Sequence, residues 1–88
     1  MKAIITVIGK DKTGIVAGVS AKIAELGLNI DDITQTVLDD YFTMMMLVSA
    51  SEKKDFTWLR SELEALGHDL NVKINIQSSA IFDAMHNL

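Results

Sequence analysis

The residues best suited to ligand chemistry lie in the segment 9–14 (Gly-Lys-Asp-Lys-Thr-Gly), which separates an apolar run from a helical pattern. Gly14, at the start of the helical pattern, lets the backbone approach a ligand closely. The unpaired N–H groups and the positive dipole end of a helix start favour a carboxylate there. Asn29, further along the chain, carries both a donor and an acceptor, which suits a zwitterionic amino acid. In the structural alternative, Asp11 caps the helix, Gly14 packs and Asn29 turns the chain.

Motifs for catalysis or metal binding are weak. The chain has no cysteine, which excludes thiolate chemistry and cysteine-ligated zinc. His68 follows a glycine and His86 lies near the end of the sequence, where surface positions are expected. The aspartates available to join them in a metal site are Asp31, Asp32, Asp39 and Asp40. Their spacing matches no strong ligand motif, so a metal-dependent enzyme is the weakest of three functional hypotheses, and we expect no cofactor.

Length and composition predict one folded domain. Chains normally divide into several domains only at lengths well above 88 residues. With 49% hydrophobic and 23% charged residues, the chain is not of the disordered class. A net charge of −4 argues against a nucleic-acid backbone as partner. The sequence opens on an alternating pattern without signal-peptide features, and no apolar run approaches the ~20 residues of a membrane span, so we expect a cytoplasmic protein.

Hydrophobic periodicity predicts strands over residues 2–8, 28–38, 41–50 and 72–77. The first is apolar on both faces, which is typical of a central strand. In the second, Ile30 and Ile33 lie three residues apart, which predicts a bulge near residues 31–32. In the third, one face is fully apolar and the other (Tyr41, Thr43, Met45, Leu47, Ser49) is too apolar for contact with water alone. That second face indicates a partner.

Helical spacing predicts two long helices and a short terminal one. The first begins at Ile15, after a cap from Asp11 or Thr13, and ends at Gly27. The second is capped by Ser51 and ends at Gly67. The last segment, residues 79–88, places four apolar residues along one side of a helix: Ile81, Phe82, Met85 and Leu88. Because so short a helix is marginal in water, it should dock on another surface.

The order strand, helix, strand, strand, helix, strand predicts an α+β fold. Right-handed crossovers join two such halves into a four-stranded antiparallel sheet with both helices on one face, the ferredoxin-like βαββαβ plait. Acyl-phosphate hydrolysis on this fold would need an arginine in the first loop, but the single arginine is Arg60, in the second helix. RNA binding would need aromatic residues in a basic field, whereas Tyr41 lies beside Asp39 and Asp40.

The sequence resembles the ACT domain in two segments, residues 9–16 (Gly-Lys-Asp-Lys-Thr-Gly-Ile-Val) and residues 26–30 (Leu-Gly-Leu-Asn-Ile). It most closely resembles the small stand-alone ACT-domain proteins of bacteria, which are related to the ACT domains of glycine-cleavage regulators. The resemblance implies an ACT domain over residues 1–78 and a helical extension over 79–88. ACT domains are regulatory modules that bind amino acids or other small effectors, usually between two domains near the first loop and second strand. By resemblance, the ligand-binding positions are Asp11, Thr13, Gly14, Ile15, Asn29 and Ile30.

The leading hypothesis is therefore a non-enzymatic, homodimeric sensor of a small effector such as an amino acid, which regulates a separate protein. Lys10 or Lys12 is a candidate partner for the ligand carboxylate, and Asn29, Asp11 or Asp31 for its amino group. One departure from the family pattern is Thr13, which replaces the common proline before the loop glycine and leaves the loop less rigid. The second hypothesis is a protein–protein assembly module that binds no effector.

Overall fold

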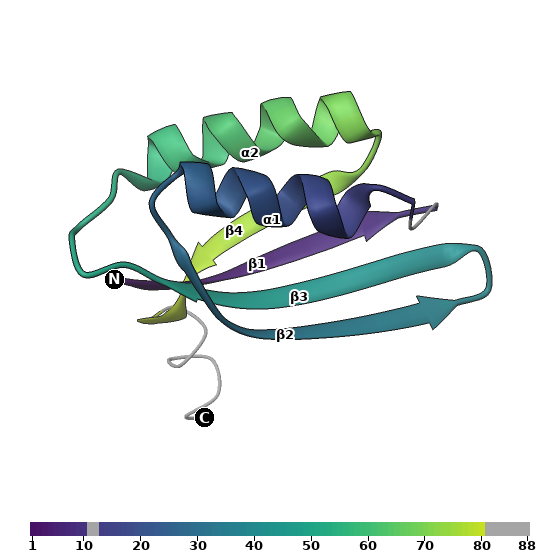
Figure 1. The fold of residues 1–88 in the computed structure, drawn as a ribbon, viewed down its shortest axis with the longest axis horizontal. Helices are drawn as coiled ribbons and strands as arrows, with labels where there is room; N and C mark the ends of the chain where they lie inside the picture. The colour runs from purple at the N-terminus through teal and green to yellow at the C-terminus, as the bar shows by residue number, and fades with distance from the viewer. Residues whose placement is uncertain (11–12, 81–88) are drawn as a thin grey trace.

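The computed structural model describes residues 1–10 and 13–80 and confirms the ferredoxin-like βαββαβ fold. The elements in chain order are β1 (Lys2–Gly9), α1 (Ile15–Glu25), β2 (Asn29–Leu38), β3 (Tyr41–Ser49), α2 (Phe56–Leu70) and β4 (Lys73–Ser78). Both helices cover the same face of the sheet, and the β2–β3 hairpin extends beyond them (Figure 1).

The sheet has the strand order β2-β3-β1-β4, and all three pairings are antiparallel. The prediction that the first strand is central is confirmed, because β1 pairs with β3 on one side and β4 on the other. Alternate residues of β1 and β3 turn toward the helices and are fully or nearly fully buried. Among residues 1–10 and 13–80, sixteen buried hydrophobic residues form a core between the helices and this inner face.

Helix α1 begins and ends at glycines in the left-handed conformation. Gly14, which has no side chain, occupies its N-cap position with φ 75°. Thr13, one of the two expected caps, lies one residue before this position, and the other, Asp11, lies outside the described residues. At the other end, Gly27 has φ 78° and donates its N–H to the Ala24 carbonyl, while Leu28 N–H donates to the Ile23 carbonyl. This pair of hydrogen bonds is the Schellman motif, which confirms the predicted end of the helix.

Helix α2 starts and stops later than the sequence pattern predicts. Its N-cap is Asp55, whose carboxylate accepts a 2.9 Å hydrogen bond from the Thr57 N–H, so the predicted cap at Ser51 is wrong. The predicted end at Gly67 is also wrong, because the helix continues to Leu70 and Asn71 takes the left-handed cap position with φ 57°. Gly67 is instead buried within the helix, where an added Cβ would lie 2.7 Å from the Val72 carbonyl oxygen.

Strand β2 is exposed over its whole length of ten residues. It forms one edge of the sheet, and in the part of the chain that the structure describes its one strand partner is β3. The predicted irregularity is confirmed, since the register shifts between Ile30 and Asp32. The hairpin turns at residues 39–40, and Asp39 adopts φ 54°. Four apolar side chains of this strand are exposed: Ile30, Ile33, Val37 and Leu38.

The predicted terminal helix lies largely outside the described residues. Residues 79–80 are helical, and the Ser78 hydroxyl oxygen accepts a 3.2 Å hydrogen bond from the Ala80 N–H at that start. The apolar positions predicted for this helix, Ile81, Phe82, Met85 and Leu88, belong to the segment 81–88, which is not described. Within the described ranges, no helix has the length and apolar character needed to cross a membrane.

Candidate functional site

The candidate site begins where β1 leaves the sheet and α1 starts. Thr13 and Gly14 are exposed, and Ile15 is buried with 2% of its surface accessible. The first α1 hydrogen bond runs from the Gly18 N–H to the Gly14 carbonyl, at 2.9 Å. An α-helix provides no internal acceptor for the N–H groups before that point. The helix start therefore offers backbone donors, with a positive dipole end, beside a glycine that has open space around its Cα. Asp11, predicted to join this site, lies outside the described residues.

Asn29 and Ile30 lie at the opposite end of α1 from Gly14. The helix has 11 residues, which corresponds to a length of about 16 Å. Asn29 pairs with Ser49 at the start of β2, at the end of the sheet where β1 begins. The predicted site residues therefore form two separate groups within one chain: Thr13, Gly14 and Ile15 in one, and Asn29 and Ile30 in the other. Both Asn29 and Ile30 are exposed.

The tip of the β2–β3 hairpin lies at the same end of the sheet as Gly14. Val37 pairs with Phe42, and Phe42 pairs with Gly9, the last residue of β1. Val37 and its neighbour Leu38 are 64% and 73% exposed. Sequence analysis did not assign them to the site. The signal that could have found them is two consecutive apolar residues directly before an Asp-Asp turn, where polar residues are expected.

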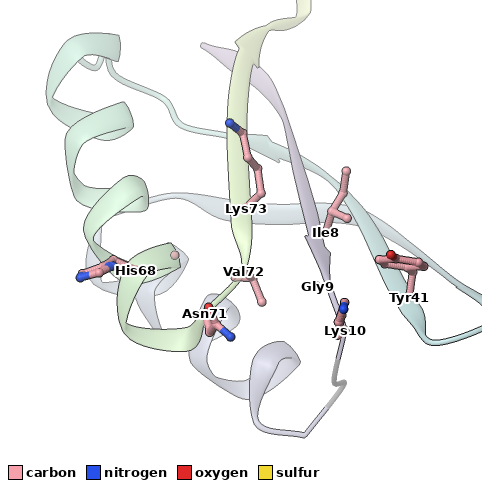
Figure 2. Close-up of a pocket in the computed structure, with 9 residues that line it drawn as sticks. Ile8, Gly9, Lys10, Tyr41, His68, Asn71, Val72 and Lys73 are labelled. Atoms are coloured by element: carbon pink, nitrogen blue, oxygen red, sulfur yellow. The ribbon is translucent and has the colours of Figure 1, made fainter.

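An open cleft of about 470 Å³ lies at this end of the sheet, next to the end of β1 (Figure 2). Ile8 and Lys73, which pair across β1 and β4, line one part of it. Lys10 lines another part, with its Nζ atom 5.9 Å from the centre of the Tyr41 ring, within cation–π range. Figure 2 shows the His68 side chain directed away from these residues, although His68 belongs to the cleft lining. Sequence analysis named Lys10 but missed Tyr41 and Lys73 as its neighbours.

The charges around the cleft suit an anion. Among the described residues that line it, two are lysines and none is acidic. Like Ile8, Lys10 lies on the face of the sheet that is turned away from the helices, because its Nζ atom lies over the ring of Tyr41, which is on that face. Lys10 is thus on the opposite face from the start of α1. In the described part of the chain, no three histidine, cysteine or acidic side chains converge on a position that could hold a metal ion.

Comparison with known proteins assigns the family. The sequence model described as the ACT domain matches residues 2–77, which includes every element of the sheet except the last residue of β4. The chain belongs to the ACT domain family. The resemblance inferred from residues 9–16 and 26–30 is therefore confirmed.

Several proteins are similar to this ACT domain. A UPF0237 protein of Streptococcus mutans is 81% identical over 88 residues, which is 100% of both chains. A solved ACT domain protein from Streptococcus pneumoniae is 79% identical and superposes with a TM-score of 0.90 over 93% of each chain. A protein assigned as a glycine cleavage system transcriptional repressor is 26% identical, with a TM-score of 0.75 over 86% of this chain and 44% of that one. The predicted similarity to glycine-cleavage regulators is thus also confirmed.

Proposed function

We propose that this ACT domain is a non-enzymatic regulatory module that binds an amino acid between two copies of the chain. The observation that carries the proposal is the long edge strand β2, which is exposed on both faces and ends at the same end of the sheet as the open start of α1. The similarity to a protein assigned as a glycine cleavage system repressor supports a role in amino-acid metabolism. A ligand between the copies would alter their relative orientation, and a separate protein would respond to the change.

Of the two sheet edges, β2 is better suited to pair with a second copy. Strand β4 has six residues and contacts helix α2, and its outward residues Lys73, Asn75 and Gln77 are polar. Strand β2 has ten residues, four of them exposed and apolar. A long edge strand with unpaired backbone groups and apolar side chains tends to pair with another chain. Pairing through β2 would continue the sheet across a two-fold axis.

A two-fold axis through the middle of β2 would unite the two groups of site residues. If the two antiparallel strands overlap fully, Asn29 lies opposite the partner's Leu38. Every other pair of facing residues then has numbers that also add up to 67. Asn29 of the partner subunit would then lie opposite Leu38, at the end of the sheet where α1 starts. The separation of the two groups within one chain is therefore compatible with a shared site, since each site would take one group from each copy.

The charges on β2 permit this register. Asp31 would lie opposite the partner's Thr36, and Asp32 opposite the partner's Gln35, so no two carboxylates face each other. Ile30 would lie opposite the partner's Val37, which forms an apolar cross-strand pair at each end of the interface. Like charges directly opposite destabilise a strand pair, whereas apolar pairs stabilise it by up to about 1 kcal/mol.

The ligand chemistry follows from the two halves of the site. The backbone N–H groups at the start of α1 would bind the carboxylate, and the amide oxygen of the partner's Asn29 would accept from the ammonium group. The sequence suggested Lys10 or Lys12 for the carboxylate. The Lys10 side chain lies over Tyr41 on the other face of the sheet, and Lys12 lies outside the described residues. Ile30 is exposed on β2 and can provide apolar contact at the edge of the site, whereas Ile15 is buried in the core and holds the start of α1 in place.

Titration calorimetry of the intact chain against each of the twenty amino acids tests the proposal, with sedimentation velocity of the same samples. We expect a dimer at micromolar concentration and heat from one or a few amino acids. A dimer that is silent to all of them at millimolar concentration contradicts the effector but not the interface. A monomer contradicts the shared site.

The second candidate, an assembly module with no effector, is favoured by one observation. The outer face of the sheet carries exposed Ile8, Tyr41 and Met45, and the helices do not cover it. An assembly module would retain partner binding in a Gly14→Ala variant, whereas an effector sensor would lose ligand response. Measuring both properties in that variant distinguishes the two functions.

A further inference from the structure

We infer that the open cleft beside the end of β1 binds a small phosphorylated molecule, at a site separate from the amino-acid site proposed above. The cleft has a volume of about 470 Å³ and includes Ile8, Lys10 and Lys73 of the sheet face that is turned away from the helices. The start of α1 lies on the opposite face. The inference is therefore independent of the proposed function.

The two lysines of the cleft are neighbours on one face of the sheet. Lys73 pairs with Ile8 across β4 and β1, and Lys10 follows Ile8 by two residues. In a regular sheet, residues in this diagonal relation lie about 7–8 Å apart. In Figure 2 the Lys73 side chain extends along β4, away from Lys10. Both side chains are exposed, and a lysine stem is long and flexible, so the two ammonium groups can both contact one anion placed over Ile8.

No carboxylate balances these two charges within the described part of the chain. The ion pairs there join Lys22 to Glu25 and to Glu62, and neither lysine of the cleft takes part in one. Lys10 instead has its Nζ atom 5.9 Å from the centre of the Tyr41 ring. The chain as a whole has a net charge of −4, so a pair of neighbouring unbalanced cations is a local exception. Because like charges repel, an anion bound between them is favoured.

A phosphate group matches this pair of charges better than a carboxylate does. A phosphate monoester carries about −1.5 to −2 charges at pH 7 and has three acceptor oxygens, whereas a carboxylate carries a single charge. Asn71, which caps the end of α2 in the left-handed conformation, also lines the cleft and has an exposed amide donor. The net charge of the chain disfavours a polynucleotide, so the phosphate belongs to a small molecule.

The cleft has room and apolar surface for more than a phosphate group. Its volume of about 470 Å³ lies within the ~300–1,000 Å³ of typical small-molecule pockets. Ile8 is 42% exposed and Tyr41 is 49% exposed, and Val72 is half-buried beside them. These three side chains can bury an apolar or planar part of the ligand. The ligand class is therefore a phosphate monoester with an organic body.

NMR titration of the intact ¹⁵N-labelled chain tests the inference with three probes at constant ionic strength. The probes are phenyl phosphate, inorganic phosphate and benzoate. We expect saturable shifts of the amide signals of Ile8, Lys10 and Lys73. Phenyl phosphate should bind roughly 3- to 5-fold more tightly than inorganic phosphate, because its ring buries apolar surface. It should also bind about 2- to 5-fold more tightly than benzoate, because it carries the additional charge.

Charge-neutralising variants assign the binding to the cleft. Lys10→Gln and Lys73→Gln should each weaken phenyl phosphate binding by about 2- to 5-fold, the loss expected for one exposed ion pair. Lys2→Gln is the matched control, because Lys2 is also exposed on the outer face of β1. It precedes Ile8 by six residue steps, or about 20 Å along the strand. The control should leave the affinity unchanged.

Three results would overturn the inference. The first is the absence of shifts at Ile8, Lys10 and Lys73 at millimolar phenyl phosphate. The second is an equal affinity of the Lys73→Gln and Lys2→Gln variants, which would reduce binding to the general charge of the surface. The third is a set of shifts centred on Gly14 and Ile15 that neither cleft variant changes, since this would place the phosphate at the start of α1. Benzoate binding as tight as that of phenyl phosphate would contradict the phosphate class.

Discussion

Gly9 and Val72 are packed so closely that an added Cβ at residue 9 would lie 2.5 Å from the Val72 Cγ1 atom. Gly9 is the last residue of β1, and Val72 connects α2 to β4. The same added atom would lie 3.3 Å from Ile15 Cδ1, at the start of α1. This contact therefore joins the ends of three elements beside the candidate site, and it requires glycine for space.

The first prediction is that Gly9→Ala destabilises the fold by about 1–3 kcal/mol, the usual range for overpacking a core. Val72 is β-branched, so its methyl groups cannot easily turn away. Urea unfolding measures the change. The double variant Gly9→Ala/Val72→Ala provides the control, because removing the methyl groups of residue 72 should recover part of the loss. If Gly9→Ala costs the same free energy in both backgrounds, the contact with Val72 is not the cause.

The second prediction concerns Gly14, where space is not the constraint. No heavy atom lies within 4 Å of an added Cβ at this residue, but its φ of 75° is left-handed. Gly14→Ala should therefore cost about 1–2 kcal/mol of folding free energy from backbone strain alone. Gly14→Asn is the matched control and should cost less, because asparagine tolerates this conformation. Denaturant titration of both variants decides the point, and equal losses would contradict a conformational origin.

The fold could be predicted from the sequence because most of its elements carry a clear hydrophobic pattern. The apolar character of both faces of β1 indicated the central strand, the fully apolar face of β3 indicated the inner face, and helical spacing after Ile15 helped to give the order. The predicted ends of α2 were wrong because each end has two residues of a type that can cap a helix. These are Ser51 and Asp55 at the start, and Gly67 and Asn71 at the end. At the start of the helix, the hydrogen bond from the Thr57 N–H to Asp55 decides between the alternatives, and at its end Gly67 is packed within the helix against the Val72 carbonyl. Similar short motifs compete wherever a helix boundary is assigned from one sequence.

The candidate site was harder to predict because its parts are distant along the chain or depend on a second copy. Gly14 was found from a local motif, since a glycine at a helix start is visible in the sequence. The approach of Val37 to this end of the sheet depends on the register of β2, β3 and β1, which periodicity does not determine. The same holds for Lys10 and Tyr41, which meet because neighbouring strands end together.

The third prediction is that Asp55→Ala destabilises the protein by about 1 kcal/mol, because the Thr57 N–H loses its acceptor at the start of α2. Asp55→Asn keeps an acceptor and should retain most of the stability. Ser51→Ala tests the position favoured by sequence analysis and should have little effect. The midpoints of thermal unfolding rank the three variants. A larger loss for Ser51→Ala than for Asp55→Ala would contradict the capping contact.

The fourth prediction tests the β2 interface and its register. Ile30→Glu or Val37→Lys alone should raise the dimer dissociation constant by at least ~10-fold, because each buries a charge against an apolar side chain of the partner. Their native side chains are 39% and 64% exposed in the single chain, so neither change should unfold it. The combined variant Ile30→Glu/Val37→Lys should recover dimerisation, since it sets opposite charges against each other at both ends. Sedimentation velocity measures each dimer, and no recovery in the combined variant contradicts the register.

The fifth prediction tests whether Asn29 belongs to the ligand site. Asn29→Ala should weaken amino-acid binding by about 5- to 150-fold, which corresponds to the ~1–3 kcal/mol of a buried polar group left unpaired. Asn75→Ala is the matched control, because Asn75 is also an exposed strand asparagine but lies on β4, away from the β2 edge. Calorimetry with the amino acid that binds the native dimer gives both affinities. Since sedimentation reports the dimer separately, lost affinity in an intact dimer assigns Asn29 to the ligand, and unchanged affinity removes it from the site.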